Sequence, residues 1–173
     1  RSSAASDVYK RQVQPHLSSR LALPYTENLQ YTKEEIAVRG CAPRYMTDQG
    51  GAFELVETED GFAICQKITP QIIPTNWRFR GTPLPLTCFG DDKWRSYSME
   101  AEVKLSNLEE HNFAGIGIRY NSTVTCEFTS MCGYSGRLYG DGSWKLMDME
   151  SVAAEGITQH IDPKQWNKLK LVV

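Results

Sequence analysis

The sequence lacks the features that mark several large classes of protein. No apolar run approaches the ~20 residues that a membrane-spanning helix needs. The net charge is only −2 over 173 residues, which gives no basic surface for nucleic acid or for an anionic membrane. Hydrophobic residues make up 40% and charged residues 23%, values ordinary for a globular protein. We therefore expect no transmembrane segment, no nucleic-acid partner and one hydrophobic core.

Clustered metal ligands are also missing. The chain has five cysteines but no Cys-x-x-Cys pair, and its three histidines are scattered. This spacing argues against a zinc site. The odd number of cysteines leaves both free thiols and disulfides open.

The two ends of the chain do not resemble folded elements. Residues 1–12 (RSSAASDVYKRQ) have no initiator Met, no apolar segment and no periodicity, and they resemble a cloning or sequencing scar. We expect residues 1–20 to be unstructured and residues 21–173 to form one domain. Residues 169–173 (LKLVV) have the pattern of a strand with no turn signal after it. The sequence therefore predicts a domain that is truncated at its C-terminus.

Helical periodicity is scarce, and alternation with a period of two takes its place. Residues 97–105 (YSMEAEVKL) are apolar at every odd position and polar or charged at every even one, as in a strand with one buried face. Weaker strands are predicted at 53–57, 62–68, 113–120, 133–139 and 143–147.

Turn signals join these strands. Asp60-Gly61 and Asp141-Gly142 predict two hairpins. Only residues 32–38 favour a short helix, with Thr32 as its cap and Glu35 three residues on. Many short strands with little helix predict an all-β fold, an antiparallel β-sandwich or jelly roll.

Two tryptophans follow acidic turns. Trp94 precedes the strand at 97–105, and Trp166 precedes the one at 169–173. Because an indole ring buries ~150–250 Å², we predict that both anchor the core where a strand begins.

Two motifs concern chemistry. Glu100 and Glu102 project from one face of a strand, ~6.5–7 Å apart, and glycoside hydrolysis requires paired carboxylates. Lys104 continues the same stripe, so we interpret it as a solvated face and predict no catalytic residue in this chain. Asn121-Ser122-Thr123 matches the N-glycosylation acceptor pattern, in an expected loop after residue 120. It favours a secreted or lysosomal route.

A resemblance to a known family rests on several separated motifs. They begin with Leu23-Pro24-Tyr25 and the run at 42–54 (APRYMTDQGGAFE). The strand pattern at 62–66, Trp77 after a proline-rich stretch, Phe89-Gly90-Asp91 with Trp94, and the Trp166 strand follow in the same order. Over residues 21–173 the sequence resembles the C-terminal lectin-like domain (concanavalin-like) of galactosylceramidases, glycoside hydrolase family 59.

The resemblance implies a parent enzyme. Galactosylceramidases are lysosomal hydrolases that release galactose from galactosylceramide and related sphingolipids. Their catalytic carboxylates lie on a TIM barrel that precedes this region, and no residue here matches them. The resemblance therefore implies an accessory domain that helps to form the substrate pocket, with a galactolipid and its own catalytic barrel as partners. Alone, it would be inactive.

The resemblance also implies particular site residues. Trp77 stands where the family has a Trp in the wall of the galactose pocket, although two extra residues separate it from Gln66. Glu27-Asn28-Leu29 stands where the family has Asp-Asp-Phe beside a structural calcium, and Gly61 with Phe62 matches a further part of that site. Asp141 replaces an Asn that the family glycosylates.

Two other functions remain open at this point. One is a non-enzymatic carbohydrate-binding or adhesion β-sandwich, since such folds host many functions. The other is an autonomous hydrolase that uses Glu100 and Glu102.

Overall fold

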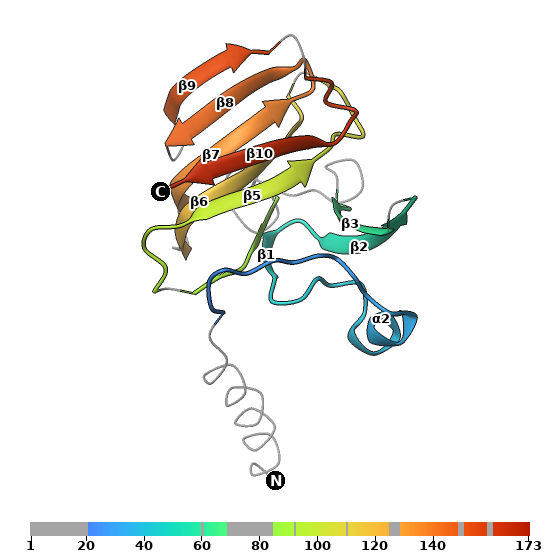
Figure 1. Cartoon of the computed structure of the whole chain (residues 1–173). Helices are drawn as coiled ribbons and strands as arrows, with labels where there is room; N and C mark the ends of the chain where they lie inside the picture. The colour runs from blue at the N-terminus through green and yellow to red at the C-terminus, as the bar shows by residue number, and fades with distance from the viewer. Residues whose placement is uncertain are drawn as a thin grey trace. The chain divides into compact units, whose positions relative to one another are not determined.

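The computed structural model describes residues 21–59, 61–68, 85–91, 93–109, 111–124, 129–148, 151–158 and 161–173. Within them, strands predominate and every pair of hydrogen-bonded strands is antiparallel (Figure 1). The predicted all-β class is therefore confirmed, while the lectin-like sandwich stays a prediction. In this part of the chain, no helix has the length and apolar character needed to span a bilayer.

The chain divides into two compact units. The first covers the described residues from 21 to 68 and from 85 to 94, and the second covers those from 95 to 173. The elements of the first unit are α2 (Lys33–Arg39), β1 (Thr47–Gly50), β2 (Phe53–Thr58), β3 (Gly61–Gln66) and β4 (Leu86–Cys88).

Helix α2 begins with the predicted cap. The Thr32 hydroxyl accepts a hydrogen bond from the Glu35 N–H (3.1 Å), and the Glu35 carboxylate accepts one from the Thr32 N–H (2.9 Å). These reciprocal bonds satisfy two of the N–H groups that a helix start leaves without partners. The helix ends where the Gly40 N–H donates to the Ile36 carbonyl (2.8 Å).

The first unit contains two short ladders. Strands β2 and β3 pair from Phe53 opposite Gln66 to Thr58 opposite Gly61, which confirms the predicted hairpin. Leu55 on β2 and Ala63 on β3 are buried. Strands β1 and β4 form the second ladder, which was not predicted because segments of four and three residues carry almost no alternation.

The second unit consists of a four-stranded sheet and a two-stranded ladder that packs against it. Its strands are β5 (Ser98–Val103), β6 (Phe113–Val124), β7 (Thr129–Tyr139), β8 (Ser143–Asp148), β9 (Ser151–Ile157) and β10 (Asn167–Val172). Strands β6 to β9 form one antiparallel sheet in chain order, and β10 pairs with β5 (Figure 1). The predicted hairpin at Asp141-Gly142 is confirmed, because it joins β7 to β8.

The core of the second unit lies between the sheet and the β5–β10 ladder. Leu138 is fully buried on β7, and Ile116 and Ile118 on β6 are 5% exposed. A Cβ on Gly136 would stand 3.4 Å from the Leu171 side chain, so β10 packs closely on β7. Burying each such aliphatic side chain stabilises the fold by ~1.5–3 kcal/mol.

The prediction that both tryptophans anchor the core is wrong for Trp166. Its side chain is 45% exposed, whereas Trp94 is half-buried. Strand β10 turns its odd-numbered residues inward, as the less exposed Leu169 and Leu171 show. Position 166 has the opposite parity, so its indole ring projects outward, 5.8 Å from the Lys104 ammonium.

Candidate functional site

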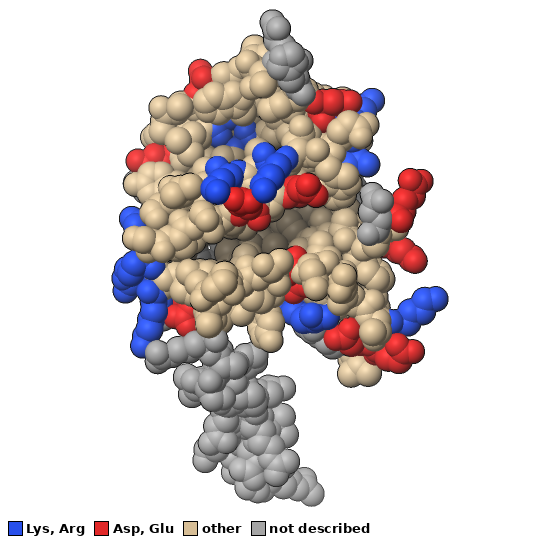
Figure 2. Space-filling model, viewed as in Figure 1, with Lys and Arg blue, Asp and Glu red and all other residues tan. Residues whose placement is uncertain are grey.

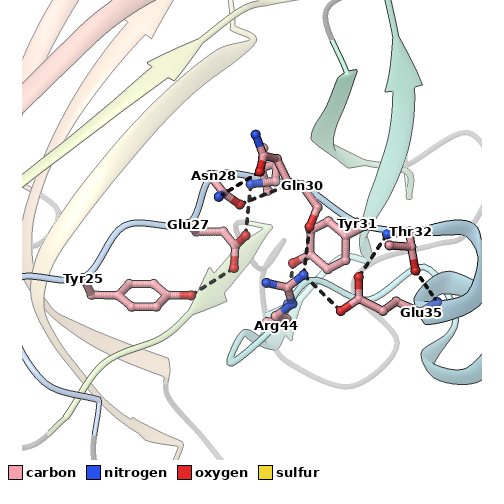
Figure 3. A network of polar contacts seen from close by, with 9 residues as sticks. Tyr25, Glu27, Asn28, Gln30, Tyr31, Thr32, Glu35 and Arg44 are labelled. Carbon is pink, nitrogen blue, oxygen red and sulfur yellow. Dashed lines mark hydrogen bonds and ion pairs between the residues drawn. The ribbon is translucent and has the colours of Figure 1, made fainter.

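The segment that carries the first resemblance motif is held by a polar network in the first unit (Figure 3). The Tyr25 hydroxyl donates to one carboxylate oxygen of Glu27 (2.9 Å), and the Leu29 N–H donates to the other (3.0 Å). Burial and the neighbouring Glu27 carboxylate raise the pKa of Tyr25. The phenol therefore remains a proton donor at neutral pH, and it fixes the orientation of Glu27.

Arg44 organises the other half of this network (Figure 3). Its guanidinium lies 4.3 Å from the centre of the Tyr31 ring, where the negative face of the ring attracts a cation. It also donates to the Gln30 carbonyl (2.8 Å) and to Glu35 (3.2 Å). One side chain thus ties residues 30–31 to helix α2. No spacing in the sequence indicated this role for Arg44.

The four residues predicted to bind calcium lie in the same unit. Tyr31, three residues after Asn28, contacts Phe62 edge to face, with ring centroids 6.3 Å apart. Asn28 accepts a hydrogen bond from the Gln30 N–H (3.0 Å), and it carries no charge. Gly61 could contribute only its carbonyl oxygen.

These residues do not make a complete calcium site. Ca²⁺ prefers six to eight oxygen ligands, and Glu27 is the single carboxylate among the four predicted residues. Its oxygens already accept hydrogen bonds from Tyr25 and Leu29. Within the described part of the chain, no three Asp, Glu, His or Cys side chains gather as a metal-binding group. The donor set is therefore incomplete among the described residues, and the calcium site stays a prediction.

An aromatic cluster brings together motifs that are far apart in the sequence. Tyr25 lies 5.9 Å from Phe89 between ring centroids, and Phe89 lies 6.4 Å from Trp94. The Trp94 indole N–H donates to the Leu21 carbonyl (3.0 Å), across 73 positions of sequence. The cluster continues to Tyr45, whose ring centroid lies 6.0 Å from that of Tyr25. Tyr45 is 63% exposed. Solvent therefore reaches one aromatic ring of the cluster.

The run Asp48-Gln49-Gly50-Gly51 covers the end of β1 and the first residue of the link to β2. The Asp48 carboxylate accepts a hydrogen bond from the Phe53 N–H (3.0 Å). Gly51 has a positive φ of 79°, and a Cβ there would stand 2.8 Å from the Gln66 amide and 3.0 Å from Pro85. The positive φ favours glycine, and a Cβ would also lie tightly against Pro85, whereas the amide end of Gln66 could move aside. Asp48 and Gly51, which belong to the run at 42–54 that resembles the family, therefore have structural roles where β1 leads into β2.

The remaining predicted site residues lie elsewhere. Trp77 lies outside the described residues. Asn121 lies within β6, where it pairs with Cys132 on β7, so the expectation of a loop after residue 120 is wrong. The strand resumes beyond an irregularity between Ile118 and Asn121, which the alternation at 113–120 does not indicate.

Of the cysteines, Cys41, Cys65 and Cys88 are free thiols. Burial and the nearby Asp48 raise the pKa of Cys88.

Glu100 is an ion-paired surface carboxylate of the second unit. It lies 2.5 Å from the Lys168 ammonium and 2.7 Å from that of Lys170, both on β10. Hydrogen bonds from these two lysines lower the pKa of Glu100 to about 2. It is therefore ionised at any physiological pH and cannot donate a proton to a leaving group. Charged side chains of both signs are scattered over the visible face in Figure 2.

Comparison with known proteins adds no relative: no family model, no curated protein and no solved structure matches this chain.

Proposed function

We propose that this chain is the lectin-like accessory region of a galactosylceramidase-type glycoside hydrolase, which acts in the lysosome on galactosylceramide and related sphingolipids. In this proposal it contributes to the galactolipid pocket and supplies no catalytic carboxylate. One observation carries the proposal. Two motifs that resemble the family in sequence, Leu23-Pro24-Tyr25 and Phe89-Gly90-Asp91 with Trp94, contribute Tyr25, Phe89 and Trp94 to one aromatic cluster of the first unit.

The cluster has the physical character of a sugar-binding surface. The apolar C–H face of a galactose ring packs well on an aromatic ring, and binding sites combine such rings with a few placed polar groups. Tyr45 offers an exposed ring, and the adjacent network holds Tyr25 and Glu27 in fixed orientations. Trp77 is the residue to which the family resemblance assigns the pocket wall.

The environment of Glu100 supports a non-catalytic role. A glycosidase needs a general acid with a raised pKa and a second carboxylate across the scissile bond. The pKa of Glu100 is instead lowered to about 2 by two lysines. This disfavours an autonomous hydrolase built on Glu100 and Glu102.

The test is the sequence of the transcript upstream of residue 21. The proposal predicts an open reading frame that encodes a TIM barrel with two glutamates in catalytic positions. A signal peptide joined directly to this region would refute the proposal and favour a free-standing carbohydrate-binding protein.

A second test uses the purified chain with a fluorogenic β-galactoside. We expect no turnover above the buffer blank, in the wild type and in Glu100→Gln alike. Turnover that Glu100→Gln abolishes would contradict the proposal. Lys170→Gln is the matched control, because it removes one neighbour of Glu100 and keeps the carboxylate.

A further inference from the structure

A row of charged side chains crosses the four-stranded sheet of the second unit. Arg137 on β7 stands directly opposite Gly115 on β6 and opposite Lys145 on β8. Lys145 in turn stands opposite Glu155 on β9. Successive residues of a strand point to opposite faces, and the neighbouring Gly136 and Leu138 face the core. The row therefore lies on the face directed away from the β5–β10 ladder.

Two aromatic rings flank this row. The Arg137 guanidinium lies 4.6 Å from the centre of the Phe113 ring. Phe113 and Tyr139 are paired across β6 and β7, with ring centroids 5.5 Å apart. The Lys145 ammonium lies 5.4 Å from the Tyr139 ring. We call these five residues, Phe113, Arg137, Tyr139, Lys145 and Glu155, the aromatic–basic patch.

The charges of the patch are not balanced. Arg137 and Lys145 are like charges directly opposite on neighbouring strands, an arrangement that destabilises a sheet. Glu155 forms an ion pair with Lys145, at 3.4 Å, and its side chain is 60% exposed. The patch therefore carries two positive charges and one negative charge, in a chain whose net charge is −2. An anion beside Arg137 would remove the repulsion.

Arg137 also has hydrogen-bond donors to spare. Its Nε donates to the Ser135 hydroxyl (3.1 Å), which fixes the plane of the guanidinium. Among the described residues, its two terminal amino groups have no acceptor. A guanidinium offers a planar fork that matches a carboxylate or sulfate with two parallel hydrogen bonds. Stacking on Phe113 holds that fork in place before any ligand arrives.

We propose that the aromatic–basic patch binds an acidic sugar, with its sulfate or carboxylate group on Arg137 and Lys145. The ring of the sugar packs on Tyr139, and Glu155 accepts hydrogen bonds from its hydroxyls. The anion contact rests on the patch alone. The choice of a sugar rests on the proposed function, because that function makes the chain part of a carbohydrate-binding protein.

The test is calorimetric titration of the full chain at constant ionic strength with four probes: galactose 6-sulfate, galacturonic acid, galactose and sodium sulfate. We expect both acidic sugars to bind at least about tenfold more tightly than galactose, since a charge-assisted hydrogen bond contributes on the order of a tenfold change in affinity. We also expect them to bind more tightly than sulfate alone. Equal affinity for galactose and the acidic sugars would overturn the proposal, and equal affinity for sulfate and galactose 6-sulfate would overturn the sugar part.

Variants locate the site. Arg137→Gln and Lys145→Gln should each weaken binding of galactose 6-sulfate about tenfold or more. Arg137→Lys should also weaken it, because it keeps the charge and loses the fork. Lys168→Gln removes an exposed charge that pairs with Glu100, and it should leave the affinity unchanged. Equal losses in Lys168→Gln and Lys145→Gln would show a nonspecific charge effect and refute the patch. Retained binding in Arg137→Gln would refute it as well.

The two proposals fail separately. If the upstream transcript lacks a catalytic barrel but Arg137→Gln abolishes binding of galactose 6-sulfate, the patch stands and the parent enzyme does not. If the barrel is present and the patch variants bind normally, the reverse holds.

Discussion

The two units of this protein are stabilised by different kinds of interaction. The second unit is a regular sheet whose strand register places apolar side chains on one face, as in Leu138 and Ile116. The first unit has shorter ladders and depends on bonds between side chains and backbone, such as those of Glu27, Arg44 and Asp48. A periodic pattern therefore describes the second unit well. Specific residue identities describe the first unit, which also contains the first of the motifs that resemble the family.

The largest expected effect concerns the core of the second unit. Leu138→Ala removes a fully buried side chain between the sheet and the β5–β10 ladder, and it should cost ~2–5 kcal/mol of unfolding free energy. Urea denaturation followed by circular dichroism measures this loss. Val152→Ala, at a side chain that is 47% exposed, is the control and should change stability by under ~0.5 kcal/mol. Similar losses at both positions would contradict the assigned core.

The next effect tests the turn of the first unit. Gly51→Ala should cost ~1–2 kcal/mol for its left-handed conformation, and a further ~1–3 kcal/mol for overlap with Gln66 and Pro85. Gly40→Ala is the control for a positive φ without close packing, because Gly40 has a φ of 76° with an extended ψ of −169° and nothing within 4 Å of a Cβ. It should show only the conformational cost. Equal melting temperatures for the two variants would show that the close packing at Gly51 is unimportant.

A smaller effect tests the polar network. Tyr25→Phe keeps the ring and removes the hydrogen bond to the Glu27 carboxylate, so it should cost about 1–3 kcal/mol. Tyr45→Phe, at an exposed hydroxyl, should cost less than ~0.5 kcal/mol. Chemical denaturation of the two variants in parallel compares them. A neutral Tyr25→Phe would mean that the network follows the fold rather than stabilising it.

The smallest effect is a pH dependence in the second unit. The pKa of Glu100 is lowered in the folded state from its usual 4.5 to about 2, so the folded state favours the ionised form. The resulting stabilisation is complete above pH 4.5 and is lost as the pH falls toward 2. Glu100→Gln should therefore flatten the fall of melting temperature between these values. An unchanged pH profile would show that the ion pairs with Lys168 and Lys170 contribute nothing measurable.

The sequence predicted the strands whose alternation is set by burial on one face. The pattern at 97–105 gave β5, and Asp141-Gly142 gave the hairpin of β7 and β8. It failed for β9, where six of the seven residues are exposed and alternation has no cause. It failed for Trp166 because the inward-facing residues of β10 have odd numbers, whereas position 166 is even and its ring projects outward.

The site was less predictable than the fold. Thr32 and Glu35 were predicted because a capping box has a fixed spacing, and the structure confirms both. Arg44 and Tyr45 act through contacts with residues 9 to 20 positions away, which no local pattern encodes. The aromatic–basic patch likewise depends on the register of four strands. Register is a tertiary property, because pairing partners are chosen by the whole sheet.

The measurement that tests the central claim most directly is the effect of Trp77→Ala on the longer enzyme that the proposal predicts. The family resemblance assigns Trp77 a role in galactose binding, and Trp77 lies outside the described residues. We predict that kcat/KM for galactosylceramide falls about tenfold or more, because the pocket loses an aromatic contact, and that the melting temperature is unchanged. An unchanged kcat/KM, or a stability loss of the ~3–5 kcal/mol expected for a core tryptophan, would contradict the account.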